Sequence, residues 1–452
     1  MKSLLIPLLS LALGVGIAAA ETLVSPKPFL QVQDGETVVF LGDSITHQSL
    51  YTQYLEDFYY TRFPERRIQF HNAGVGGDKA ADALARFDDD VAAFNPDHVT
   101  ILLGMNDGQY EPFSKDTLET YQRGMEEILT RIDAIGAEAI AFSPTMYDHH
   151  QFALRKNDET FRFRDRPSDP GYNSLLAYYA SWLRQTAYGH DVAFVNLWGP
   201  LNDITFAMRS SQPNFSVIED AIHPGAAGHF IMASSIIAQS NPERRTVSNI
   251  IIVRDGDQWV AGRKQGVTEL RANEDESEMS FTFLASALPW VVPESTSKYD
   301  LKWGPSAPAS LGYALTKAGH KLSRELLRVD GLPAGNYELC IDEIVVGTFS
   351  ERQLGAKVEL QNFPQTPQSQ QALEVALLNQ QKNDEFIRPL RDAWSKVKSL
   401  RRKNDSELFE KNYPILMAKI DTLNEQAKAL ENEIYRINQP VPRQYLLKRV
   451  SD

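Results

Sequence analysis

The chain has 452 residues, 42% hydrophobic and 23% charged, which is the composition of a globular protein long enough for two or three domains. Its 46 basic and 59 acidic residues give a formal net charge of −13, which argues against general binding to the phosphate backbone of nucleic acids. A single cysteine, Cys340, excludes an intrachain disulfide framework and a metal site built from several cysteines.

The first twenty residues have the pattern of a secretory signal peptide. Lys2 supplies positive charge, residues 4–17 are apolar, and Ala18-Ala19-Ala20 offers a cleavage site. An uncleaved anchor is the alternative, but the apolar run is short for a membrane span of about 20 residues. No later segment is apolar enough to cross a membrane. We therefore predict export to the periplasm or the medium, with cleavage after Ala20.

Between residues 37 and 240, short apolar runs alternate with amphipathic stretches. Strands are predicted at 37–41, 68–70, 98–103, 139–142 and 192–195, and helices at 50–62, 80–94, 114–135 and 173–188. This alternation predicts a parallel sheet covered by helices on both faces. Ligands bind such sheets beyond the carboxyl ends of the strands. Functional residues are therefore expected directly after the strands.

The segment 145–172 interrupts the alternation and is rich in His, Arg, Asp and Phe. We interpret it as a long loop over the crevice, because long loops in compact domains are often functional. An insertion without function is the alternative.

From about residue 247 the pattern is that of a small β-rich domain. A hairpin is predicted from 250 to 260 around Asp255-Gly256-Asp257, with further strands at 326–329, 337–341 and 344–349. The turn-rich segment 331–335 would connect the first two of these later strands. Exposed aromatic residues here could bind carbohydrate, although aromatic residues more often belong to a core; the residues in question are Trp259, Trp290 and Trp303.

Two long helices are predicted after a Pro/Gln-rich linker at 364–370. The second helix carries an apolar stripe with spacings of three and four, formed by Ile420, Leu423, Ala427, Leu430, Ile434 and Ile437. The stripe favours a helix hairpin packed on the rest of the chain. A coiled-coil dimer through these helices is the alternative, so the oligomeric state stays open.

Four short motifs carry residue types suited to acyl transfer. The first, Gly42-Asp43-Ser44-Ile45-Thr46, follows the first predicted strand. Ser44 would stand at the mouth of the crevice, with its own N–H near a helix N-terminus that favours an oxyanion. The alternative is that Ser44 or Asp43 only caps the next helix.

The second and third motifs follow the next strands of the predicted sheet. Asn72-Ala73-Gly74-Val75-Gly76-Gly77-Asp78 has glycines that let a backbone approach a ligand closely, although a tight turn explains them equally well. In Gly104-Met105-Asn106-Asp107, the Asn106 amide can donate to a developing negative charge or form an Asx turn.

The fourth motif, Asp220-Ala221-Ile222-His223-Pro224, places a carboxylate three residues before a histidine. A histidine base needs such a partner to hold its tautomer and to stabilise the imidazolium. His229 is interpreted as structural, and the adjacent pair His149-His150 is weak support for a site. The histidines show no recognisable metal-ligand spacing.

In this order the four motifs resemble those of the SGNH (GDSL-type) hydrolases, over about residues 35–240. The resemblance implies a flavodoxin-like three-layer α/β/α sandwich. It also implies Ser44 as nucleophile, His223 as general base and Asp220 as its orienting acid. The oxyanion hole would consist of the Ser44 N–H, the Gly77 N–H and the Asn106 side chain, with Gly76 as the alternative to Gly77. The implied mechanism needs no metal or other cofactor.

The predicted organisation is a signal peptide at 1–20, an SGNH hydrolase domain at 21–245, a β-rich accessory domain at 246–363 and a C-terminal helical region at 364–452. Around residues 332–337, the C-terminal half resembles extensions found in some exported bacterial members of the family. This second similarity implies no activity.

We expect an exported serine esterase that removes small acyl groups, acetyl foremost, from carbohydrate. Its partner would be a small-molecule or polysaccharide ester, with no nucleic acid and no membrane span. The alternatives are a lipolytic or aryl esterase, an O-acyltransferase that excludes water, and a binding scaffold without catalysis. The complete set of Ser44, Asn106, Asp220 and His223 argues against the scaffold.

Overall fold

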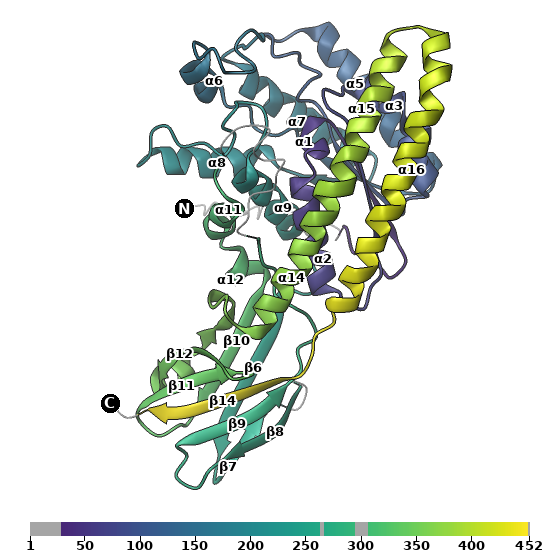
Figure 1. The fold of residues 1–452 in the computed structure, drawn as a ribbon. Helices are drawn as coiled ribbons and strands as arrows, with labels where there is room; N and C mark the ends of the chain where they lie inside the picture. The colour runs from purple at the N-terminus through teal and green to yellow at the C-terminus, as the bar shows by residue number, and fades with distance from the viewer. Residues whose placement is uncertain (1–28, 263–265, 294–305, 451–452) are drawn as a thin grey trace, which may run out of the picture.

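The computed structural model describes residues 29–262, 266–293 and 306–450. The predicted signal peptide and Trp303 lie outside these residues. Within them, no helix is both long and apolar enough to span a membrane. The chain forms an α/β domain, a β-rich region at one end of it and a long helical hairpin along its side (Figure 1).

The α/β domain is built on a parallel five-stranded sheet with the order β2-β1-β3-β4-β5. Its strands are β1 (Thr37–Gly42), β2 (Gln69–Gly74), β3 (His98–Leu102), β4 (Glu138–Phe142) and β5 (Ala193–Val195). Strand β1 is buried along its whole length, as expected for a central strand covered on both faces. The predicted parallel sheet is confirmed, and its order is that of flavodoxin-like folds. Strand β2 runs to Gly74, so the second motif begins inside the strand and not after it.

Helices cover both faces of this sheet because β1 leads to β2 in one direction and β3 leads to β4 in the other, and right-handed crossovers then fall on opposite faces. The helices are α1 (Ser44–His47), α2 (Leu50–Arg62), α3 (Ala80–Leu84), α4 (Phe87–Asp90), α5 (Lys115–Ala134), α6 (His149–Arg155), α7 (Tyr172–Gly189), α8 (Trp198–Arg209) and α9 (Ala226–Ser240), with a 3₁₀ turn η1 (Ala92–Phe94). Tyr121 of α5 stacks on Tyr179 of α7 at 4.6 Å between ring centroids, while α2 packs against α9.

The β-rich region consists of two sheets with the orders β13-β10-β6-β7 and β12-β11-β14-β9-β8. The strands are β6 (Thr246–Asp255), β7 (Gln258–Ala261), β8 (Val267–Ala272), β9 (Glu278–Phe283), β10 (Arg324–Asp330), β11 (Asn336–Ile341), β12 (Ile344–Ser350), β13 (Val358–Glu359) and β14 (Arg443–Val450). Apolar residues of both sheets share one core. The predicted hairpin is confirmed as β6 and β7, whereas β10 and β11 belong to different sheets.

Part of the 246–363 segment packs on the α/β domain as well as on the β-rich region. Helices α11 (Ala309–Thr316) and α12 (Ala318–Leu322) contact α9. Trp290 is fully buried in the core of the α/β domain, so the core role that the sequence favoured over carbohydrate binding is confirmed for Trp290. A boundary at residue 245 therefore does not separate two independent cores.

The C-terminal hairpin consists of two antiparallel arms. The helical elements from residue 351 onward are α13 (Glu351–Ala356), a 3₁₀ turn η2 (Leu360–Asn362), α14 (Pro367–Lys382), a π-helical turn η3 (Asn383–Ile387), α15 (Arg388–Arg402) and α16 (Ser406–Ile437). The arm formed by α14, η3 and α15 lies along the α/β domain, and α16 returns beside it (Figure 1). The apolar stripe of α16 packs inside this chain, with Ile420 and Leu423 against Trp394 of α15.

The region predicted as helical, 364–452, ends in a strand. Strand β14 pairs antiparallel with both β11 and β9 and so forms the middle of its sheet. The last segment of the chain thus closes a sheet that begins about 170 residues earlier, a long-range pairing that local sequence patterns do not encode.

Candidate active site

The carboxyl ends of β1, β2 and β3 bring the first three motifs together. The link is the Asn106 side chain, which follows β3. Its Nδ2 donates to the backbone oxygen of Asp78, after β2, at 3.1 Å, and to Asp43 Oδ2, after β1, at 3.3 Å. The expectation that polar residues gather at this edge of the sheet is therefore met.

The fourth motif adds a histidine and a carboxylate to the same place. His223 Nε2 lies 2.9 Å from Ser44 Oγ, and His223 Nδ1 lies 2.8 Å from Asp220 Oδ2. All three side chains are buried, with no more than 9% of each residue exposed. Ser44, His223 and Asp220 therefore form one continuous chain of hydrogen bonds, although 179 positions separate Ser44 from His223.

Asp220 is held by a tight turn of its own loop. Its Oδ1 accepts the N–H of Ile222 at 2.9 Å and that of His223 at 2.6 Å. Burial favours the protonated form, but the charge of His223 and these hydrogen bonds outweigh it and keep the pKa of Asp220 below its usual value. Asp220 therefore stays ionised and can stabilise an imidazolium on His223.

The first motif was considered both for helix capping and for a nucleophile, and the structure gives these roles to different residues, Asp43 and Ser44. Asp43 caps α1, because its Oδ1 accepts the N–H of Ile45 at 2.9 Å. The hydroxyl of Ser44 is left for His223. Burial raises the pKa of Asp43 to about 7, so near neutral pH the position beside Ser44 carries only part of a negative charge.

The two adjacent glycines after β2 differ in their hydrogen bonds. The N–H of Gly76 donates to His47 Nδ1 at 3.3 Å. Gly77 has a positive φ of +70°, and no acceptor in the described part of the chain takes its N–H. A methyl group on Gly77 would have no heavy atom within 4 Å, so this position borders open space. Of the two, Gly77 has the N–H that is available to a ligand.

The Asn106 side chain is held from both ends. Besides the two acceptors of its Nδ2, its Oδ1 accepts the hydroxyl of Tyr110 at 3.0 Å. The two Nδ2 contacts are moderately long, so the amide can share a hydrogen with an additional acceptor without turning.

The segment 145–172 covers the histidine, as expected of a loop over the crevice. It begins with α6, and its buried Phe163 lies 5.5 Å from the His223 ring, measured between centroids. Arg166 stacks over both Phe163 and Tyr110, at 5.0 and 4.8 Å from the ring centroids. The sequence interpretation did not identify Phe163, although an alternating Phe161 and Phe163 in a polar loop is a signal for burial.

Two of the other histidines considered from the sequence, His229 and His149, have hydrogen-bond partners within the fold. His229 is fully buried, accepts the N–H of Tyr51 at 3.3 Å and lies 3.1 Å from Gln48 Oε1, which agrees with its structural interpretation. His149 lies 3.2 Å from Ser168 Oγ in the covering loop. The described residues contain no group of His, Cys, Asp and Glu that could hold a metal ion.

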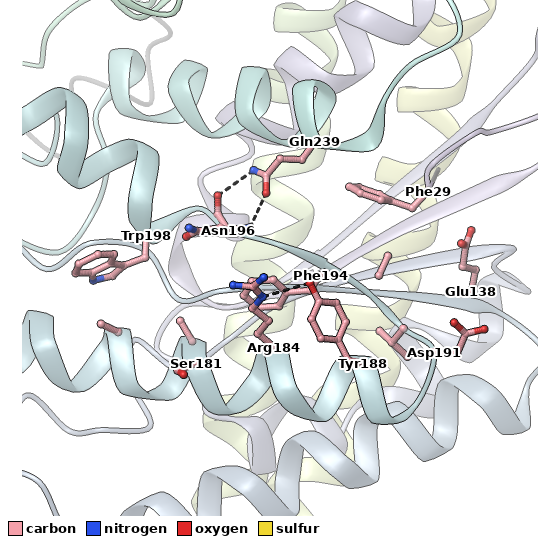
Figure 2. Close-up of a pocket in the computed structure, with 14 residues that line it drawn as sticks. Phe29, Glu138, Ser181, Arg184, Tyr188, Asp191, Phe194, Asn196, Trp198 and Gln239 are labelled. Carbon is pink, nitrogen blue, oxygen red and sulfur yellow. Dashed lines mark hydrogen bonds between the residues drawn. The ribbon is translucent and has the colours of Figure 1, made fainter. Parts of the chain in front are cut away.

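A cavity of about 730 Å³ lies elsewhere, between α7 and the edge strand β5 (Figure 2). None of the four motifs lines it. Two of its lining residues hydrogen-bond to each other. Gln239 accepts the N–H of Asn196 at 2.9 Å and donates to the carbonyl of Asn196 at 3.0 Å. This cavity is separate from the Ser44 site.

Comparisons with known proteins agree with this fold. Residues 40–231 match the model of the GDSL-like Lipase/Acylhydrolase family. An acetylxylan esterase of Geobacillus stearothermophilus is 25% identical over 231 residues, which cover 46% of this chain and 96% of that enzyme.

Among solved structures, a gut microbial diltiazem-metabolizing enzyme has a TM-score of 0.78 and 25% identity, covering 94% of this chain and 99% of that one. A catalytic mutant of the acetylxylan esterase has a TM-score of 0.38 and 22% identity, covering 47% and 98%. Residues 40–231 thus form a GDSL-like hydrolase domain, and the chain is an ester-hydrolysing enzyme.

Proposed function

We propose that this protein is an exported serine esterase that removes acetyl groups from carbohydrate through Ser44, His223 and Asp220. The observation that carries the proposal is the hydrogen-bond chain from Ser44 Oγ through His223 to Asp220, at 2.9 and 2.8 Å. Nucleophile, base and orienting acid in this arrangement define a serine hydrolase by geometry and not by sequence position.

In the proposed reaction His223 Nε2 takes the proton of Ser44, and Ser44 Oγ attacks the ester carbonyl. The N–H groups of Ser44 and Gly77 and the Asn106 amide stabilise the oxyanion. His223 then protonates the leaving sugar oxygen. A water molecule activated by the same histidine releases acetate and regenerates Ser44.

The acetyl group and the sugar are proposed from the acetylxylan esterase, whose length this chain matches almost completely. A second candidate is a small aryl-bearing acetate. It is favoured by the likeness to the diltiazem-metabolizing enzyme, which extends over 94% of this chain. Export rests on the N-terminal sequence pattern.

The test measures acetate release from acetylated xylan, acetylated xylo-oligosaccharides and diltiazem, with p-nitrophenyl esters of short and long acyl chains alongside. Wild type and Ser44→Ala are compared. We expect acetate release that Ser44→Ala lowers by roughly 10⁴-fold or more. Release from diltiazem alone would favour the second candidate, and hydrolysis of long-chain esters alone would indicate a lipolytic enzyme. A Ser44→Ala variant with near-normal turnover would overturn the mechanism.

A further inference from the structure

Helix α15 contacts the loop that carries Gly77. Val75, directly before the two glycines, is fully buried and shares an apolar cluster with Leu390, Trp394 and Val397 of α15. More than 300 positions separate the loop from the helix. The C-terminal region therefore lies against the loop assigned to the oxyanion hole, and not at a distance from it.

Lys398 of α15 contacts both sequence neighbours of Gly77. Its Nζ donates to the carbonyl oxygen of Gly76 at 3.2 Å and pairs with Asp78 Oδ1 at 2.6 Å. The Lys398 side chain is 13% exposed and that of Asp78 is completely buried. Lys398 Nζ also lies 3.5 Å from Asp82 Oδ2, so two of its three partners, Gly76 and Asp78, flank Gly77.

The carbonyl of Gly76 and the N–H of Gly77 belong to the same peptide unit. This bond is trans, so the two groups point in opposite directions. A carbonyl held toward α15 by Lys398 turns the Gly77 N–H away from α15. Glycines on both sides make a flip of this peptide cheap, so an outside contact is needed to fix it. The ammonium charge also polarises the peptide and strengthens the N–H as a donor.

Two further residues of α15, Arg391 and Asp392, support the end of β2 and the loop that follows it. Arg391, which is fully buried, donates from Nε to the carbonyl of Gly74 at 2.9 Å and from Nη1 to that of Asn72 at 2.5 Å. Asp392 Oδ1 lies 3.3 Å from Nε2 of His47, whose Nδ1 accepts the Gly76 N–H. Helix α15 thus contacts the end of β2 and, directly or through His47, the loop that follows it.

We propose that Lys398 is a positioning residue for ester hydrolysis, which fixes the Gly76–Gly77 peptide so that the Gly77 N–H faces the oxyanion. This inference rests on the proposed function, because it requires Gly77 to be an oxyanion donor. It gives the C-terminal hairpin a role in positioning an oxyanion donor. Lys398 also lies outside residues 40–231, which match the family model.

The test compares wild type with Lys398→Met, Lys398→Arg, Lys396→Met and Ser44→Ala in the full chain. The readouts are kcat and KM for p-nitrophenyl acetate, the rate of inactivation by diethyl p-nitrophenyl phosphate, and the melting temperature. We expect Lys398→Met to lower kcat and the inactivation rate together by roughly 10- to 100-fold, less than the loss of a whole donor. KM should stay within about threefold, because the oxyanion forms only in the transition state.

Lys396 is the matched control, since it is exposed on the same helix, and Lys396→Met should behave as wild type. Lys398→Arg should recover most of the activity because a guanidinium can reach both partners. Asp78 keeps its contact with Arg86 at 2.8 Å, so Lys398→Met should fold. If Lys398→Met has a lower melting temperature than wild type, kcat is measured instead in a double variant that combines it with Asp78→Asn. The second substitution removes the carboxylate that has lost Lys398.

The outcomes separate the two proposals. If Ser44→Ala abolishes hydrolysis while Lys398→Met keeps kcat within twofold of wild type, the positioning role is wrong and the proposed function stands. If Ser44→Ala retains near-normal hydrolysis, the proposed function fails, and the inference fails with it.

Discussion

Gly77 and Gly76 are neighbours with the same side chain but different backbone requirements. Gly77 has a φ of +70°, a conformation that costs an L-residue about 1–2 kcal/mol. A methyl group on Gly76 would meet only His47 Nδ1, at an ordinary 3.9 Å. Conformation, and not space, is therefore what demands glycine at residue 77.

This difference predicts opposite results for two alanine substitutions. Gly77→Ala should shift the loop backbone and lower kcat for p-nitrophenyl acetate by roughly 10-fold or more, with about 1 kcal/mol of lost stability. Gly76→Ala should keep both quantities near wild type. Steady-state kinetics and urea unfolding measure the two effects. Equal kinetics of the two variants would show that Gly77 does not require its conformation for activity.

At the scale of elements, α15 is attached to the α/β domain by buried charges. Arg391 pairs with Asp90 of α4, and both side chains are completely buried. Burial opposes ionisation of Asp90, but Arg391, His71 and Arg86 together outweigh it and hold the pKa of Asp90 far below its usual value. A pair nearer the end of the same helix, Arg401 with Asp89, is more exposed, at 30% and 44% of the two side chains.

The two pairs should therefore differ in their contribution to stability. Arg391→Leu leaves a buried carboxylate with fewer partners, and we expect it to lower the free energy of unfolding by about 3 kcal/mol at pH 7. Arg401→Leu should cost less than about 1 kcal/mol. Urea unfolding of both variants gives the comparison.

The two variants should also differ in their response to acid. Because the folded-state pKa of Asp90 is depressed, its contribution in wild type is fully present above the unfolded pKa and is lost progressively as the pH falls through the folded pKa. In Arg391→Leu that pKa rises toward the unfolded value, so the acid-dependent loss of stability is smaller and is complete at a higher pH. Similar stabilities of the two variants, with the same acid dependence, would contradict the assigned role of the buried pair.

At the scale of the whole molecule, the sequence predicts what is local and misses what is distant. Alternating apolar runs are a local property, so the five strands and helices α2, α5 and α7 of the α/β domain were predictable, and four short motifs marked the Ser44 site. Helices α6, α8 and α9 were not predicted. The contact of Lys398 with Gly76 joins residues 322 positions apart. Neither residue carries a pattern that points to the other. Strand β14 was missed for the same reason.

The domain boundary is the clearest case of this limit. A change of periodicity near residue 247 marks where the β-rich pattern begins, but the chain later returns to the α/β domain. Trp290 stacks on Phe230 of α9 at 4.7 Å between centroids and donates from Nε1 to the carbonyl of Tyr54 at 3.1 Å. Arg62, also buried, donates to the carbonyl of Leu322 at 2.9 Å. The α/β domain is therefore completed by residues far beyond 245.

We accordingly expect that a chain ending at residue 245 does not form the native α/β domain. It would expose the aromatic surface that Trp290 covers and leave buried polar groups such as Arg62 without their partners. It would also lack every contact that α15 makes with the Gly77 loop. Gel filtration, circular dichroism and p-nitrophenyl acetate hydrolysis should show aggregation or loose packing and little activity.

A graded comparison separates this packing from the loss of chain length. In the full chain, Trp290→Ala removes one buried aromatic side chain and should lower the free energy of unfolding by about 3–5 kcal/mol, while Ser44 and Lys398 keep their contacts. Such a variant should therefore melt earlier yet retain kcat at low temperature. If the chain ending at 245 instead melted cooperatively near the wild-type temperature with wild-type kcat, the α/β domain would be independent of the C-terminal half. The support assigned to α15 would then be unnecessary for catalysis.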